Sequence, residues 1–231
     1  MQQDFPVVYW LHGSNGSGQS LEPLASKFND AMSQGLMPES IIVFPESKRL
    51  SMWVNSKDNS YPSEDILIND LMPHVESKYR ISDSRNDHYI AGFSMGGYGA
   101  ARLGLKYSDH FGHIIMVGAG TLDESLENTP RANDQTKTSV LNAVYGGSDN
   151  YFYEQSPRFE ALQNKKTLLN NPLSITIIVG KKDEVYSQNI DFADFLREQN
   201  IRHRLVSLPG ISHSLREYIM MSKGALFNNV W

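Results

Sequence analysis

The chain has 231 residues, of which 40% are hydrophobic and 20% are charged, and its formal net charge is −5. This length and composition suit one globular domain with a hydrophobic core, so we treat residues 1–231 as a single domain. An acidic chain is a poor match for nucleic acid or an anionic membrane surface, because both select basic patches. No apolar run approaches the roughly 20 residues that cross a bilayer, so we expect no membrane partner.

The sequence contains no cysteine. This excludes disulfides, zinc sites built on thiolates and a cysteine nucleophile. The first ten residues, MQQDFPVVYW, lack the basic stretch and apolar core of a secretory signal. We therefore expect a cytoplasmic protein, and a secreted form stays open if the natural N-terminus is longer.

Six short apolar runs rich in β-branched residues predict strands, and helix-like segments lie between them. Near-continuous apolarity, as in SIIVF, HIIMV and ITIIV, is typical of strands buried on both faces of a mostly parallel sheet. Alternating strands and helices predict an α/β fold with helices on both faces of that sheet. The predicted strands are 7–11, 41–44, 88–93, 113–117, 175–179 and 204–208, and the predicted helices include 64–79, 97–107, 187–199 and 214–227.

Residues 11–20, LHGSNGSGQS, form a glycine-rich loop between the first predicted strand and a helix-like segment. Two chemistries use such a loop. A phosphate-binding loop would match the spacing of Gly13 and Gly18, but Gln19 replaces the required lysine and no magnesium-binding aspartate follows the strand IIVF. An oxyanion loop would direct a backbone N–H at a developing negative charge.

Residues 88–104, HYIAGFSMGGYGAARLG, carry the strongest local signal. A predicted strand leads into Gly92-x-Ser94-x-Gly96 and then into a helix of small residues, which is the context of the nucleophile elbow G-x-S-x-G. The turn is so sharp that side chains two residues before and after the serine would collide. A glycine-rich helix N-terminus without function is the weaker interpretation. We predict Ser94 as a nucleophile, which needs a base and an orienting acid.

Asp183 lies four residues after the fifth predicted strand, and His213 lies in the loop after the sixth. Both positions follow carboxyl ends of strands, where open α/β sheets bind ligands. The order Ser94, Asp183, His213 is that of an α/β-hydrolase triad, in which His213 takes the serine proton and Asp183 holds the imidazole. Asp123, which follows the predicted strand 113–117, is the alternative candidate for the orienting acid.

The remaining acids and histidines are assigned no part in catalysis. Glu184 would point away if Asp183 points in, and Asp191 lies inside a predicted helix. The pair His110-x-x-His113 has no carboxylate at ligand spacing, so we expect no metal site, and we expect no cofactor. Five histidines are interpreted as surface or capping residues without a partnered acid: His74, His88, His110, His113 and His203.

Residues 119–172 interrupt the alternation of strands and helices. They are polar and weakly periodic at first, then aromatic and rich in turn residues. Insertions at the carboxyl edge of a sheet often cover a binding site, so we expect this one to cover part of the active site. For residues 121–138, a disordered surface loop is an equally good interpretation.

Several motifs together resemble the esterase D branch of the α/β-hydrolase superfamily, which includes S-formylglutathione hydrolases, feruloyl and acetyl esterases, and antigen 85 mycolyltransferases. PVVYWLHG is similar to the family's strand and oxyanion loop, AGFSMGGYGAARLGLKYSDHFGHIIMVGAG to its elbow, helix and next strand, and VGKKDEVY and PGISHS to its acid and histidine loops. The resemblance covers most of the chain. It implies an α/β-hydrolase fold in which the backbone N–H groups of Ser14 and Met95 are the oxyanion donors.

Two departures from the family pattern affect the prediction. Members commonly carry further strands before the LHG strand, so we expect a minimal sheet of about six strands whose exposed first strand favours a homodimer or a shortened chain. Formylglutathione hydrolases usually carry a cysteine near the site. This chain has none, which disfavours that substrate.

We predict a serine carboxylesterase that hydrolyses short-chain or aromatic-acid esters, its small-molecule partners, through an acyl-enzyme. Trp53 and Tyr186 are candidates for lining the substrate pocket, although both residue types more often pack in a core or on a surface. Two alternatives stay open, namely an acyltransferase that uses the same triad and an inactive binding protein on the same fold. The partitioning of the acyl group between water and added alcohols distinguishes an acyltransferase from an esterase. Labelling by a fluorophosphonate distinguishes an active enzyme from an inactive binding protein.

Overall fold

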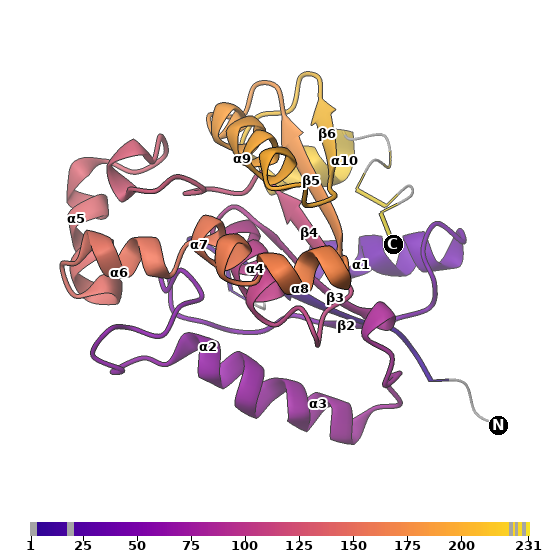
Figure 1. The fold of residues 1–231 in the computed structure, drawn as a ribbon. Helices are drawn as coiled ribbons and strands as arrows, with labels where there is room; N and C mark the ends of the chain where they lie inside the picture. The colour runs from indigo at the N-terminus through magenta and orange to yellow at the C-terminus, as the bar shows by residue number, and fades with distance from the viewer. Residues whose placement is uncertain (1–3, 18–20, 222–223, 225, 228–229) are drawn as a thin grey trace.

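The computed structural model describes residues 4–17, 21–221, 224, 226–227 and 230–231 (Figure 1). A six-stranded sheet lies at its centre, and every neighbouring pair of strands is parallel. This confirms the predicted α/β fold and the minimal sheet. In the order β2-β1-β3-β4-β5-β6, the strands are β1 (Val7–Leu11), β2 (Ile41–Val43), β3 (His88–Phe93), β4 (His113–Val117), β5 (Ser174–Gly180) and β6 (Arg204–Leu208).

The first strand is not an edge of the sheet. β1 pairs with β2 on one side and β3 on the other, and all five of its residues are buried. The chain adds β2 outside β1 and then crosses back to β3, so β2 and β6 form the two edges. The expectation of an exposed first strand is therefore wrong, and the homodimer prediction loses this argument.

Helices cover both faces of the sheet. Alternate residues of β1 point to opposite sides: Val8 and Trp10 pack in a cluster with α1 (Glu22–Ser33) and α10 (Leu215–Met221). Val7, Tyr9 and Leu11 pack in a second cluster with α3 (Met72–Lys78), α4 (Met95–Lys106) and α9 (Tyr186–Glu198). Strands buried on both faces account for the near-continuous apolar runs of the sequence.

The predicted helix 64–79 is one helical run with a change of register. α2 (Ser63–Asp65) passes into a π-helical stretch, η2 (Ile66–Leu71), and then into α3. Pro73 lies at the start of α3 and has no N–H to donate to the preceding turn. A π-helical stretch widens the helix locally and often accompanies such a disruption.

The insertion 119–172 is mostly helical. It contains η4 (Leu126–Asn128), α5 (Asp134–Tyr145), α6 (Asp149–Glu154), α7 (Pro157–Gln163) and α8 (Lys165–Asn170). Side chains at the N-caps explain three starts, because Asn133, Ser148 and Ser156 each accept a backbone N–H of the following turn. Residues 121–138 therefore include η4 and the first turn of α5, and are not a loop without structure.

Within the part of the chain that the structure describes, no helix combines the length and apolar character needed to cross a bilayer. Three residues of the glycine-rich loop, Gly18, Gln19 and Ser20, lie outside the described residues. The phosphate-loop interpretation rested partly on them.

Candidate active site

Ser94 lies at the turn between β3 and α4. Its φ of 57° and ψ of −119° fall in a positive-φ region that serine rarely adopts. A Cβ on Gly92 would overlap the backbone of Gly96, and a Cβ on Gly96 would overlap the carbonyl oxygen of Leu11. This turn therefore needs glycine at both positions, and it places Ser94 at the carboxyl end of the sheet.

The structure brings Ser94, His213 and Asp183 into one chain of hydrogen bonds. The Ser94 Oγ lies 2.8 Å from His213 Nε2. His213 Nδ1 lies 2.8 and 2.9 Å from the two carboxylate oxygens of Asp183. Because a carboxylate only accepts, Nδ1 carries the proton and Nε2 is free to accept the serine hydroxyl. The loops after β3, β5 and β6 supply one residue each.

The buried carboxylate of Asp183 is held in its ionised form. Burial alone would raise its pKa, but the hydrogen bond and charge of His213, the N–H of Val185 and the hydroxyl of Tyr218 together lower it below the usual value. The Tyr218 Oη lies 2.7 Å from Asp183 Oδ2 and accepts the N–H of Gly180 at 2.8 Å. Burial, followed by the charge of Asp183, raises the pKa of Tyr218, so this hydroxyl stays a donor.

The other acids considered have different partners. Asp123 Oδ1 accepts the backbone N–H of Glu124. Glu184 pairs with Arg131 at 2.7 Å, although one of its carboxylate oxygens lies within 4.8 Å of ligand atoms of Asp183 and His213. Asp191 lies within α9. The hydrogen bonds of His213 therefore favour Asp183 over its rival Asp123.

The glycine-rich loop lies directly against Ser94. A Cβ on Gly13 would lie 3.3 Å from the Cβ of Ser94, and Ser14 and Met95 line the same cavity as Ser94. The buried His12 accepts the N–H of Ser47 at Nε2, so its Nδ1–H donates to the carbonyl of Gly13 at 2.8 Å. That carbonyl belongs to the same peptide group as the N–H of Ser14. His12 thus fixes the orientation of the predicted oxyanion donor.

The sequence analysis did not anticipate two contacts of the candidate site, those of Tyr218 with Asp183 and of His12 with Ser47. Tyr218 is 35 residues from Asp183, and His12 is 35 residues from Ser47. Neither spacing forms a local motif. The histidine of LHG, directly before the oxyanion loop, was the only local signal available.

A cavity of about 290 Å³ opens beside Ser94. Its walls combine apolar side chains with three cations, and much of it comes from the insertion. A second cavity, of about 310 Å³, lies on the His213 side of Ser94 and is lined by Gly13, Phe93 and Leu215 among others. The first cavity is lined by Ser14, Asn15, Arg49, Leu50, Met52, Ser94, Met95, Gly120, Thr121, Leu126, Thr129, Arg131, Ala132, Thr136, Lys137, Val140 and Val185.

Trp53 and Tyr186 are not among the residues that line these two cavities. Trp53 is buried, and its Nε1–H donates to the carbonyl of His12 at 3.1 Å, so it supports the oxyanion loop from behind. Tyr186 starts α9, and its hydroxyl lies 3.4 Å from the Oγ of Ser207.

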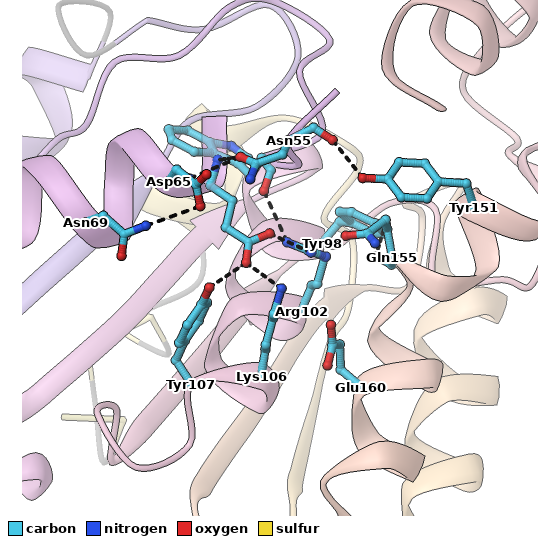
Figure 2. Close-up of polar contacts among 12 residues, drawn as sticks. Asn55, Asp65, Asn69, Tyr98, Arg102, Lys106, Tyr107, Tyr151, Gln155 and Glu160 are labelled. Carbon is cyan, nitrogen blue, oxygen red and sulfur yellow. Dashed lines mark hydrogen bonds and ion pairs between the residues drawn. The ribbon is translucent and has the colours of Figure 1, made fainter. Parts of the chain in front are cut away.

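A buried polar network holds the nucleophile helix against the insertion (Figure 2). Glu64 lies 2.6 Å from each of Arg102, Lys106 and Tyr107, all on or just after α4. Burial would raise the pKa of Glu64, but these partners lower it overall. Arg102 also contacts the side-chain amide oxygen of Gln155. The backbone carbonyl of Gln155 accepts a hydrogen bond from the hydroxyl of Tyr98.

Two histidines that were expected to lack an acid partner have one. His88 Nδ1 and His110 Nε2 lie 3.9 and 3.2 Å from the carboxylate of Glu76. The expectation failed because Glu76 comes from a separate helix, α3, which the fold brings against the start of β3.

A parallel sheet with a serine at a strand-to-helix elbow, and with a histidine and an acid in later loops, defines the α/β-hydrolase class. The model of the Esterase family matches residues 1–225, and the chain belongs to this family. It is a carboxylic ester hydrolase.

Individual relatives are distant. An acetyl esterase from Caldicellulosiruptor saccharolyticus is 22% identical over 207 residues, which cover 86% of this chain and 74% of that protein. A substrate-bound, fluorophosphonate-binding serine hydrolase from Staphylococcus aureus superposes with a TM-score of 0.77 at 23% identity, over 98% of this chain and 84% of that one. A ferulic acid esterase from Anaeromyces mucronatus, in complex with ferulic acid, gives a TM-score of 0.63 at 20% identity, over 99% and 79%.

Proposed function

We propose that this esterase cleaves its substrate through an acyl-enzyme on Ser94, with His213 as the general base and Asp183 as the orienting acid. The observation that carries the proposal is the unbroken chain of hydrogen bonds, 2.8 Å from Ser94 to His213 and 2.8 Å from His213 to Asp183. Nucleophile, base and orienting group within hydrogen-bonding reach are the signature of an activated serine.

The reaction begins when Ser94 Oγ attacks the ester carbonyl and its proton passes to His213 Nε2. Asp183 stabilises the resulting imidazolium, because it already accepts the Nδ1–H and stays ionised. The N–H groups of Ser14 and Met95 donate hydrogen bonds to the tetrahedral oxyanion. His213 then gives the proton to the leaving alcohol, the C–O bond breaks, and Ser94 carries the acyl group.

Water completes the cycle. It attacks the acyl carbonyl, His213 takes its proton, and the second tetrahedral intermediate releases the carboxylic acid as the proton returns to Ser94. Since His213 must reach the leaving oxygen, we assign the alcohol to the second cavity, which His213 lines. The acyl group then occupies the first cavity, which is lined by Ser94 and the insertion.

The substrates proposed are esters of short-chain or aromatic acids. The first cavity, at about 290 Å³, lies at the small end of ligand pockets, which supports a compact acyl group. The acetyl esterase relative and the fold shared with an esterase bound to ferulic acid agree with the two substrate types.

A panel of p-nitrophenyl esters of increasing acyl length, together with methyl ferulate, tests the proposal. We expect the highest kcat/KM at short or aromatic acyl groups, and a loss of at least about 10⁴-fold in kcat for Ser94→Ala. Ser84→Ala, at an exposed position, is the matched control. Retained activity in Ser94→Ala contradicts the mechanism, and best activity at about twelve carbons or more contradicts the substrate class. Preferential transfer of the acyl group to added glycerol would identify an acyltransferase instead.

A further inference from the structure

Glu76, His88 and His110 converge at the amino-terminal edge of the sheet. Glu76 lies on α3, His88 is the first residue of β3, and His110 lies in the turn after α4. The three ligand atoms form a compact triangle: His88 Nδ1 to His110 Nε2 is 3.1 Å, His110 Nε2 to Glu76 Oε1 is 3.2 Å, and His88 Nδ1 to Glu76 Oε1 is 3.9 Å.

These distances match the coordination sphere of a small cation. Ligand atoms of a tetrahedral zinc with bonds of about 2.0 Å lie about 3.3 Å apart, so the separations of 3.1 and 3.2 Å fit and the 3.9 Å separation must shorten by about 0.6 Å on binding. Two imidazoles and one carboxylate form a donor set that suits zinc, with water as the fourth ligand.

The surrounding contacts prepare the donor atoms. His88 Nε2 lies 2.7 Å from the carbonyl of Ser82, so it carries the proton and leaves Nδ1 of the neutral ring with its lone pair toward the triangle. This carbonyl is the kind of outer partner that orients histidine ligands. The hydroxyl of Tyr9 donates to Glu76 Oε1 at 3.2 Å and fixes the carboxylate.

The three ligand atoms share a single N–H. Glu76 Oε1 and His88 Nδ1 are both acceptors, and a single N–H on His110 Nε2 faces the two of them. His88 is almost fully buried, whereas the Glu76 and His110 side chains are 28% and 39% exposed, which leaves an entry path.

We propose that Glu76, His88 and His110 form a structural zinc site that joins α3, the start of β3 and the turn after α4. β3 separates the site from the nucleophile, because His88 begins the strand and Ser94 follows its end, about 20 Å away. The metal therefore stabilises the fold and does not enter the hydrolytic reaction.

Calorimetric titration of EDTA-treated protein with zinc chloride at neutral pH tests the site. We expect one zinc per chain, and a rise in Tm of about 5 to 10 °C when free zinc is 100 times Kd. His110→Ala and Glu76→Gln should each weaken binding at least about 100-fold while ester hydrolysis is retained, since both residues lie far from Ser94. His74→Ala is the control, because His74 is an exposed histidine on the same helix.

A second group of potential zinc ligands, at the candidate active site, requires a further variant as a control. Ligand atoms of Asp183, Glu184 and His213 also lie within 4.8 Å of one another, so zinc bound there would inhibit hydrolysis. Zinc binding that survives in His213→Ala and is lost in His110→Ala supports the proposal, as do visible bands of tetrahedral cobalt that follow the same pattern. Absence of zinc binding, or binding that only His213→Ala removes, overturns it.

Discussion

At the scale of single residues, further groups hold the members of the proposed triad in place. Asp183 accepts hydrogen bonds from His213, Val185 and Tyr218, and these keep a buried carboxylate ionised. His12 acts in the same indirect way on the peptide between Gly13 and Ser14. In the proposed mechanism Tyr218 and His12 are positioning residues, because Tyr218 holds Asp183 and His12 holds the peptide group that carries the Ser14 N–H.

Replacing Tyr218 by phenylalanine removes one donor from Asp183. A hydrogen bond to a charged group contributes about 1.5–3 kcal/mol, so we expect kcat to fall about 10- to 100-fold. KM should change little, because the hydroxyl contacts Asp183 and not the substrate. Steady-state kinetics measure both. Tyr79→Phe, at an exposed tyrosine, should leave kcat unchanged, and an unchanged kcat in Tyr218→Phe would contradict the assigned role.

The meeting of Ser94, Asp183 and His213 could be predicted from sequence because its signals are local. The glycines around Ser94, and the positions of Asp183 and His213 just after apolar runs, lie within a few residues of the groups that they identify. The contact of Tyr218 with Asp183 could not be predicted, and neither could the cluster of Glu76, His88 and His110. In both cases the partners are distant in the chain. Only the fold determines that α3 meets β3.

At the scale of elements, buried charges fasten α4 to its neighbours. Arg102 is fully buried, with the carboxylate of Glu64 at 2.6 Å. Since α4 begins directly after Ser94, this network supports the helix that carries the nucleophile turn (Figure 2). The insertion joins the same network through Gln155, so it is anchored independently of the cavity that it lines.

Glu64→Gln should be strongly destabilising. It leaves the buried guanidinium of Arg102 without a matching charge, and breaking a buried pair in this way costs about 3–5 kcal/mol. Urea unfolding measures the free energy. Asp194→Asn is the matched control, because its pair with Arg197 lies on the surface and contributes at most about 1 kcal/mol. Similar small losses for both variants would show that the Glu64–Arg102 pair contributes no more than a surface pair.

Glu160→Gln should stabilise the protein at neutral pH. Burial raises the pKa of Glu160, although Arg102 and Lys106 oppose this and Glu64 reinforces it. A carboxyl whose pKa is raised by folding favours the fold when protonated, and it loses that stability as pH rises through its folded pKa. Thermal melts should therefore show a higher Tm than wild type at pH 7, with the difference vanishing below about pH 4. An equal or lower Tm at pH 7 would count against the burial argument.

The strands were predicted closely because each is a short, isolated apolar run. Their order was harder: nothing in the first strand, 7–11, shows that 41–43 will lie outside it. The helix predicted at 64–79 was correct in place, but its π-helical stretch depends on hydrogen-bond register, which apolar periodicity does not encode. In 121–138 the apolar signal was weak because much of that segment faces the cavity or solvent.

At the scale of the whole molecule, the charge of the cavity differs from that of the chain. The net charge is −5, yet Arg49, Arg131 and Lys137 line the cavity beside Ser94, and none of its described lining residues is acidic. Glu184 pairs with Arg131, whereas Arg49 bonds the neutral side chain of Asn15. A local cationic surface favours esters that carry a negative group.

Arg49→Ala should therefore discriminate between two esters of similar size. We expect kcat/KM for a p-nitrophenyl succinate monoester to fall about two- to fivefold, and that for p-nitrophenyl butyrate to stay nearly constant. The difference should shrink at high salt, because the group is exposed. Lys48→Ala removes an adjacent cation that does not line this cavity and is the control. Equal losses of kcat/KM for the two esters would show that Arg49 does not favour negatively charged substrates.

The proposed mechanism requires Ser94 to be an activated nucleophile in the folded protein. Labelling with a fluorophosphonate, followed by mass spectrometry of the peptides, tests it directly. We expect one label per chain on Ser94, no label after denaturation or in Ser94→Ala, and labelling slowed by orders of magnitude in His213→Ala. Failure of folded wild-type protein to be labelled, or a label on any other serine, would contradict the assignment.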